Sequence, residues 1–335
     1  MMLSPDTAAW LRGASETFTT TLAGLAFETI PFLLMGTLLS ATIQAFVPDQ
    51  ALKRLFPKNR YLSILVALLV GVFIPICECG TVPLARRLRQ KGMPLSTAVA
   101  FLLAAPLVNP MTIISTFVAF RGTGNPVFAA RLGLGLASAF IVALIVEFAS
   151  RNHPSIDILG QSGRAAELKF TRMGGAAIPA PPLLPAASSR VTRSRPSIAS
   201  RAAATLEHAS YDFLDSGRYL IAGITIAAIA RAFIPTRAIL HSLGTPLAAT
   251  GTGLLSAYIL SLCSSADAFV ARSIFAPSSY FAVKAFLVFG PMIDLKNTIL
   301  LSRFVKPRHL IAFVGIVALV VGAVTLSASL LMEAL

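Results

Sequence analysis

The chain has 335 residues, of which 56% are hydrophobic and only 13% are charged, and its mean hydropathy is +0.77. This composition excludes an ordinary soluble domain and is typical of an integral membrane protein. The net charge is +14, but the cationic residues gather between the apolar segments. We therefore attribute the charge to the positive-inside rule rather than to nucleic-acid binding.

Seven apolar stretches are about as long as a transmembrane helix, which needs roughly 20 residues. They cover residues 18–47, 95–120, 127–148, 213–234, 246–262, 281–301 and 310–331. An eighth apolar segment begins at Tyr61. The predicted fold class is an all-α integral membrane protein with about eight hydrophobic helical segments. The first stretch lacks the basic start of a signal peptide, so we expect it to remain as a helix.

The segment Ile74-Pro-Ile-Cys-Glu-Cys-Gly80 follows an apolar run, 61–73, that contains no charged residue. Its proline and glycine interrupt regular helix, and a broken helix at membrane depth is tolerated only where it is buried in protein or lines a cavity. The run either crosses the membrane with the cysteines at its far end, or enters, turns at the cysteines and returns. The second arrangement keeps the basic loops at 53–60 and 86–91 on one face, as the positive-inside rule favours.

The composition changes between the two groups of apolar segments. Residues 151–209 are rich in arginine, proline, alanine and serine, and such a segment buries too little apolar surface to order itself. We expect a flexible linker, which its basic charge places in the cytoplasm. The linker separates a first transmembrane repeat, residues 1–150, from a second, residues 210–335.

The two halves carry the same landmarks in the same order, which is a feature of many transporters. The matched pairs are Glu28 with Asp215, Gly36–Pro48 with Gly223–Pro235, Cys77–Arg86 with Cys263–Arg272, and Pro106–Asn109 with Pro291–Asp294. If the cysteine segment enters and returns, each half makes an odd number of crossings. The second half is then inverted relative to the first.

The cysteines are the first candidates for chemistry. Cys77 and Cys79 offer two soft sulfur ligands that can converge on one ion where the backbone is not helical. Cys263 is the repeat-equivalent of Cys77. If the interrupted segments meet, three reduced thiols face one cavity and suit a transported thiophilic metal or metalloid. The alternative is that all three are small buried hydrophobic side chains.

Ionisable residues inside a membrane are expensive and usually functional. Glu78 and Asp267 are candidates for proton coupling, whereas Asp294 and Lys296 form either an internal ion pair or part of the transport path. We expect Glu28 and Asp215 to lie near the membrane interface. The predicted substrate-binding residues are Cys77, Glu78, Cys79, Gly80, Asn109, Cys263, Ser264, Ser265, Asp267, Asp294, Lys296 and Asn297.

Several classes of chemistry lack their motifs. The sequence contains no G-x-x-x-x-G-K-[ST] loop and no C-x-x-C pair, and its four histidines show no metal-ligand spacing. We expect neither a cofactor nor an enzymatic activity. Two other classes remain open: a membrane thiol oxidoreductase, and a channel or passive subunit of a larger assembly.

The ordered motifs resemble those of the ArsP/YraQ-like predicted permeases. In the first half they are Pro75–Ala85, Lys91–Leu95 and Ala105–Met111, and in the second half Cys263–Phe269 and Gly290–Asn297. The resemblance implies a multi-spanning inner-membrane permease. The best-known branch of that family exports trivalent organoarsenicals, with cysteines implicated in recognising the thiophilic atom.

Together these observations predict a plasma-membrane secondary transporter that works by alternating access. The expected solute is small, with a trivalent organoarsenical or a thiophilic metal species as the specific hypothesis. Proton antiport is the expected coupling, because no nucleotide-binding motif is present. A permease for a non-metal solute is the alternative, and the oligomeric state is not predicted.

Overall fold

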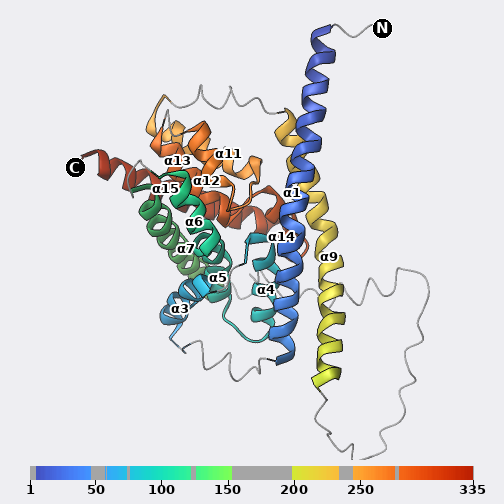
Figure 1. Cartoon of the computed structure of the whole chain (residues 1–335). Helices are drawn as coiled ribbons and strands as arrows, with labels where there is room; N and C mark the ends of the chain where they lie inside the picture. Colours follow the sequence, from blue (N-terminus) through green and yellow to red (C-terminus); the bar gives the residue numbers. More distant parts are fainter. Residues whose placement is uncertain are drawn as a thin grey trace, which may run out of the picture.

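The structure is a computed structural model, and it describes residues 5–46, 57, 59–73, 76–121, 126–152, 198–233, 244–275 and 279–334. Within these ranges the chain forms twelve α-helices and no strand (Figure 1). The predicted all-helical class is therefore confirmed for the described part of the chain. Four earlier landmarks, Pro48, Pro75, Pro235 and most of the expected linker (153–197), lie outside it.

In the described residues, each half shows six helices, and the order of their lengths is similar. The first half has α1 (Pro5–Phe46), α3 (Arg60–Phe73), α4 (Glu78–Gln90), α5 (Leu95–Val108), α6 (Pro110–Ala119) and α7 (Pro126–Asn152). The second has α9 (Ile198–Phe233), α11 (Pro246–Leu260), α12 (Asp267–Ile274), α13 (Tyr280–Met292), α14 (Leu295–Ser302) and α15 (Pro307–Ala334). In both halves, two long helices enclose four short ones.

Among the described residues, five stretches are long and apolar enough to cross a membrane, and one of them joins α13 and α14. They cover Arg12–Ile43, Val127–Asn152, Ala209–Phe233, Tyr280–Ser302 and Pro307–Leu331. Helices α5 and α6 make a sixth crossing if they count as one span bent by 42°, while α3 and α11 are shorter apolar helices. The chain is thus a multi-pass membrane protein, but the described residues do not confirm eight complete crossings.

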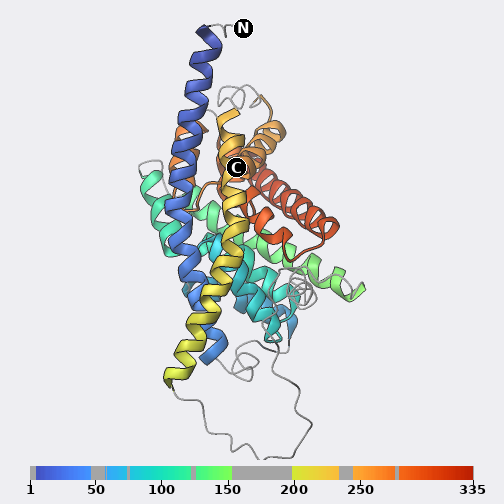
Figure 2. The same cartoon turned by 90° about the vertical axis from the view of Figure 1, so that its right-hand side faces the viewer.

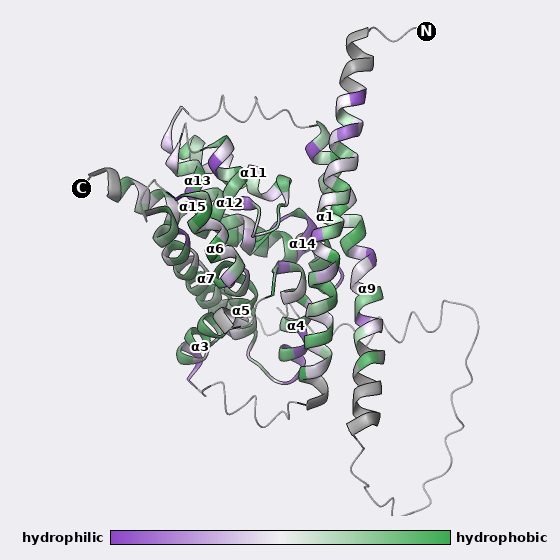
Figure 3. Ribbon diagram, in the orientation of Figure 1, coloured by the Kyte–Doolittle hydropathy of each residue, from purple (hydrophilic) through white to green (hydrophobic). Residues whose placement is uncertain are grey.

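The outer surface of the molecule suits a lipid environment. Helices α6, α7 and α15 are coloured as hydrophobic along most of their length (Figure 3). Large apolar side chains on them stay exposed, such as Leu319 and Ile114 at 75% and 57%. In water such a surface would favour aggregation, whereas in a bilayer it contacts acyl chains.

Helix α3 begins, and helix α4 ends, at the same end of the molecule. The Ser63 hydroxyl, in the first turn of α3, shares a hydrogen bond of 3.0 Å with Thr97 in the first turn of α5. Helix α5 starts five residues after α4 ends. Beside them, Ser96 donates to Glu147 at 2.8 Å, and Glu147 also pairs with Arg60. Cys77, directly before α4, is buried in the interior.

Two other helices are broken at matched positions, and in each case the second piece starts with a side-chain cap. Asn109 precedes α6 and accepts a hydrogen bond from Met111 N at 3.0 Å. Asp294 precedes α14 and accepts one from Asn297 N at 2.7 Å. Asparagine and aspartate are favoured at this position because they satisfy free amide groups of the first turn. Asn109 and Asp294, which the sequence analysis matched, therefore both cap the start of a helix.

The halves exchange contacts across the centre. Helix α4 packs on α14 of the other half, and α12 packs on α6. The guanidinium of Arg86 lies 4.3 Å from the ring centre of Phe304, and that of Arg272 lies 6.0 Å from the ring centre of Phe120. The long helices α1 and α9 run side by side along one flank (Figures 1 and 2).

Candidate functional site

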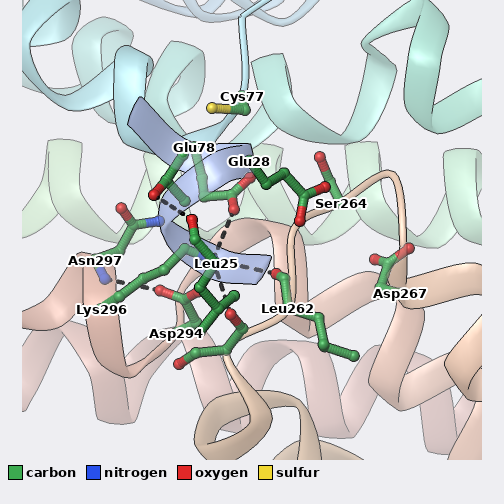
Figure 4. Close-up of polar contacts among 12 residues, drawn as sticks. Leu25, Glu28, Cys77, Glu78, Leu262, Ser264, Asp267, Asp294, Lys296 and Asn297 are labelled. Carbon is green, nitrogen blue, oxygen red and sulfur yellow. Dashed lines mark hydrogen bonds and ion pairs between the residues drawn. The ribbon is translucent and has the colours of Figure 1, made fainter. Parts of the chain in front are cut away.

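The interrupted segments of both halves meet in the interior. The turn before α4, the segment between α11 and α12, and the start of α14 converge beside the middle of α1 (Figure 4). Each of these is a place where helix ends leave backbone groups without intrahelical partners. Broken helices that meet in this way form the substrate and ion sites of many transporters.

Lys296 is the central cation of this region and is fully buried. Its Nζ lies 2.9 Å from Glu78 Oε1 and 2.7 Å from Asp294 Oδ2. It also donates to two main-chain carbonyls, Ser261 O at 3.0 Å and Leu262 O at 3.2 Å. Of the two possibilities left open by the sequence, an internal ion pair is present. It extends across the two halves because Glu78 belongs to the first.

The carbonyls that face Lys296 are available because of how α11 ends. Ser261 follows the last residue of α11 and has φ 45°, in the left-handed region that non-glycine residues rarely adopt. Its hydroxyl accepts a hydrogen bond of 3.1 Å from Leu295 N, which ties the end of α11 to the start of α14. This contact holds the turn in place although the backbone conformation costs roughly 1–3 kcal/mol.

The three thiols come together as well. Cys77, Cys79 and Cys263 are free and buried, and the Cys77 thiol interacts with the other two. They form one cluster with apolar side chains of α1 and α9, namely Leu25, Leu33, Leu220, Ile224 and Ala227. Among the described residues, no group of three or more Cys, His, Asp and Glu is arranged to hold a metal ion. The transport role of the thiols stays a prediction.

A second buried ion pair joins the halves. Arg131 on α7 donates to both carboxylate oxygens of Asp267 on α12, at 3.0 and 2.7 Å, and both side chains are almost fully buried. The same guanidinium donates to Thr116 Oγ1 at 2.7 Å. Two parallel hydrogen bonds of this kind are the strongest geometry for an arginine and a carboxylate.

Arg131 is absent from the residues predicted from the sequence. The sequence could have identified it, because this arginine lies inside the apolar stretch 127–148. An ionisable residue in such a stretch usually has a function or a buried partner. Asp267, which the sequence did select, has its charge balanced by this arginine.

Other predicted residues lie around these pairs. Ser265 donates to Glu28 Oε1 at 2.7 Å, so Glu28 lies at the centre rather than at the interface expected from its position in α1. Ser264 lies beside Glu28 in Figure 4. Asn297 is buried, and among the described residues its Oδ1 has no hydrogen-bond partner. Asn109 caps α6, and Gly80 packs against α1.

Asp215, the repeat-equivalent of Glu28, has a different environment. It pairs with Arg218 on its own helix and with Arg303 just after α14. The two acids that the sequence analysis matched, on α1 and α9, therefore have different partners.

Comparison with known proteins identifies related chains. Residues 15–330 match the ArsP_1 family model, which is described as a predicted permease. The UPF0718 protein YcgR of Bacillus subtilis is 33% identical over 299 residues, which cover 89% of this chain and 92% of the relative. A putative two-component membrane permease complex subunit of Streptococcus mutans is 33% identical over 298 residues, which cover 89% and 90%. The UPF0718 protein YraQ of Escherichia coli is 30% identical over 140 residues, 39% of each chain. No solved structure matches.

Proposed function

Because the chain belongs to the ArsP_1 family of predicted permeases, we propose that it is a secondary transporter whose small solute passes the point where the broken helices of the two halves meet. The observation that carries the proposal is the contribution of both halves to one buried polar centre. Glu78, Cys77 and Cys79 come from the first half, and Cys263, Asp294 and Lys296 from the second. Relative motion of the halves would therefore rearrange the contacts that cross between them, such as Glu78 with Lys296.

The two halves are inverted repeats in this proposal. Its support is the similar order of helix lengths and the exchanged contacts, α4 with α14 and α12 with α6. The segment from α3 to α4 is then re-entrant, since each of these helices is only about 20 Å long at 1.5 Å per residue. That is short of the roughly 30 Å hydrocarbon core.

The end of the molecule where α3 starts faces the cytoplasm on this reading. Four cations gather there, namely Arg60, Arg87, Lys91 and Arg151, and Lys91 donates to Ile43 O near the end of α1 at 2.9 Å. The positive-inside rule assigns such a face to the cytoplasm. Helix α7 ends on this face at Asn152, where the linker starts. The last part of the expected flexible linker, from Ile198, is helical instead and belongs to α9.

An asymmetry in the packing supports alternating access. Helices α1 and α9 pack on α4 and α14, with Gly36 against Gly80 and Gly223 against Lys296. They do not pack comparably on α12 and α6, which are the equivalents of α4 and α14 in the proposed repeat. We interpret the structure as one end state, closed at the end from which the linker leaves.

The three thiols support a thiophilic solute such as a trivalent organoarsenical. Uptake of methylarsenite into everted membrane vesicles tests this. We expect Cys77→Ser and Cys79→Ser to abolish uptake, because a hydroxyl is a poor ligand for a soft atom. Ala227→Ser is the matched control, since it adds a hydroxyl to the same cluster without removing a thiol, and its uptake should resemble that of the unmodified protein.

The outcomes separate the parts of this proposal. No uptake by the unmodified protein would remove the arsenical hypothesis, and equal uptake by the cysteine variants would remove the thiol site. The name of the Streptococcus mutans relative favours a second candidate, a subunit that needs a partner in a permease complex. Uptake by the purified chain alone in liposomes, driven by an imposed proton gradient, would exclude an obligatory partner.

A further inference from the structure

The oxygen atoms around the Lys296 ammonium form a cage with the chemistry of an alkali-cation site. Four oxygens lie 2.7–3.2 Å from Nζ: two carboxylate oxygens, from Glu78 and Asp294, and two main-chain carbonyls, from Ser261 and Leu262. Hard oxygen ligands of this kind bind Na⁺ and K⁺, and an ammonium group resembles K⁺ in charge and size.

The position of the cage in the fold fits such a site. Ser261 and Leu262 follow the C-terminus of α11, where the helix dipole is negative. Carbonyls at the C-terminal ends of broken helices coordinate coupling ions in several transporter folds. The left-handed Ser261 is what releases these carbonyls from the helix.

The negative charge of the cage exceeds the positive charge of the lysine. Two carboxylates face one ammonium, and among the described residues Glu78 Oε2 and Asn297 Oδ1 have no hydrogen-bond partner. Asp267 adds nothing to this balance, because Arg131 neutralises it. A net negative, buried and oxygen-rich centre favours a bound cation.

We propose that this cage is a monovalent-cation site, occupied in the present state by the tethered ammonium of Lys296. A free sodium or potassium ion takes the place of the ammonium when the Lys296 side chain swings out of the cage, since Asp294, Ser261 O and Leu262 O stay together on the second half and Glu78 faces them from α4. This inference rests on the proposed transport function, since it assigns the coupling site of the same centre.

The melting temperature of the purified protein in detergent tests the cage. It is measured in sodium, potassium or choline chloride at constant ionic strength and pH, without any transported solute. The unmodified protein should show no ion-specific change because the lysine fills the site. For Lys296→Ala we expect a saturable rise on the order of a few degrees in sodium or potassium but not in choline.

Two controls define the site. Lys284→Ala removes a buried lysine whose ammonium donates to Ser329 Oγ at 3.2 Å, and it should show no ion-specific rise. Adding Glu78→Gln to Lys296→Ala should abolish the rise, since one ligand charge is lost. If Lys296→Ala does not accumulate, Lys296→Met keeps the length of the stem and gives the same readout.

Three results would overturn the cation site. One is a folded Lys296 variant with no ion-specific rise, and another is a variant stabilised only by acidification, which would make a proton the occupant. The third is failure of both Lys296 variants to accumulate in sodium-rich and potassium-rich media alike, because the cage then accepts nothing but the lysine. Methylarsenite uptake is measured separately, so either proposal can fail without the other.

Discussion

At the scale of single residues, the centre holds buried charges whose partners come from the other half of the chain. Glu78 meets Lys296, and Asp267 meets Arg131. Charged groups at membrane depth are tolerated when they are paired and hydrogen-bonded. Each pair therefore links a short broken helix to the opposite half, and each must be kept or replaced whenever the halves move.

The protein should be destabilised much more by losing one partner of the Arg131–Asp267 pair than by losing both. Arg131→Met leaves a buried carboxylate without its cation, and we expect the free energy of unfolding to fall by about 3–5 kcal/mol. The double variant Arg131→Met with Asp267→Leu should recover most of this loss. Reversible unfolding in mixed detergent micelles measures both.

The exposed Arg272 provides the control for that cycle. Arg272→Met removes a cation that lies over an aromatic ring and donates to Ala119 O, which should cost about 1–2 kcal/mol. A double variant no more stable than Arg131→Met would show that the pair does not act as a unit.

At the scale of elements, two close helix contacts position the centre. A Cβ added to Gly36 of α1 would lie 2.5 Å from Gly80 Cα on α4. One added to Gly223 of α9 would lie 3.0 Å from Lys296 Cα on α14. Small residues let helix backbones approach within a membrane. The long pair α1–α9 is thus fitted directly against the helices that carry Glu78 and Lys296.

Gly36→Ala should destabilise the protein because the added methyl group collides with the backbone of α4. The expected loss is about 1–3 kcal/mol, typical of overpacking. Gly24→Ala on the same helix is the matched control, since a Cβ there meets nothing within 4 Å, and alanine has the better helix propensity. Melting temperatures of the two variants in one detergent provide the comparison, and equal values would contradict the close contact.

At the scale of the whole molecule, the two ends of the α3–α4 hairpin lie together with the end of α7, from which the linker leaves. In the proposed topology, the α3–α4 segment enters and leaves the membrane at this one face. Across the molecule, the ends of α6 and α12 meet through Arg272, which donates to Ala119 O. The fold thus has one polar centre between two differently packed ends.

Labelling from either side of the membrane tests this topology. Cysteines introduced as Asn59→Cys and Gln90→Cys, both at exposed positions, should react with an impermeant maleimide in everted vesicles but not in intact cells. Ser273→Cys, at the end of α12, should show the opposite pattern. The native thiols are buried and give a low background. Labelling of Asn59→Cys and Gln90→Cys from opposite faces would instead mean that the segment crosses the membrane.

Composition and local pattern were enough to determine the membrane class, the all-helical fold, the family resemblance and the helix breaks at Asn109 and Asp294. These are local properties: hydropathy is set by each stretch, and a cap is recognised from its own residue type. The predicted inverted arrangement of the halves came from matched landmarks and stays a proposal.

Only the tertiary structure decided which charges meet. Arg131 and Asp267 are 136 residues apart in sequence, and the left-handed turn at Ser261 that exposes two carbonyls to Lys296 has no sequence signature, because serine rarely adopts it. Likewise, the sequence placed Glu28 at the interface from its position in a helix, whereas packing of α1 against the segment before α12 brings it to the centre. Contacts between distant segments depend on how helices pack, and that is a property of the whole fold.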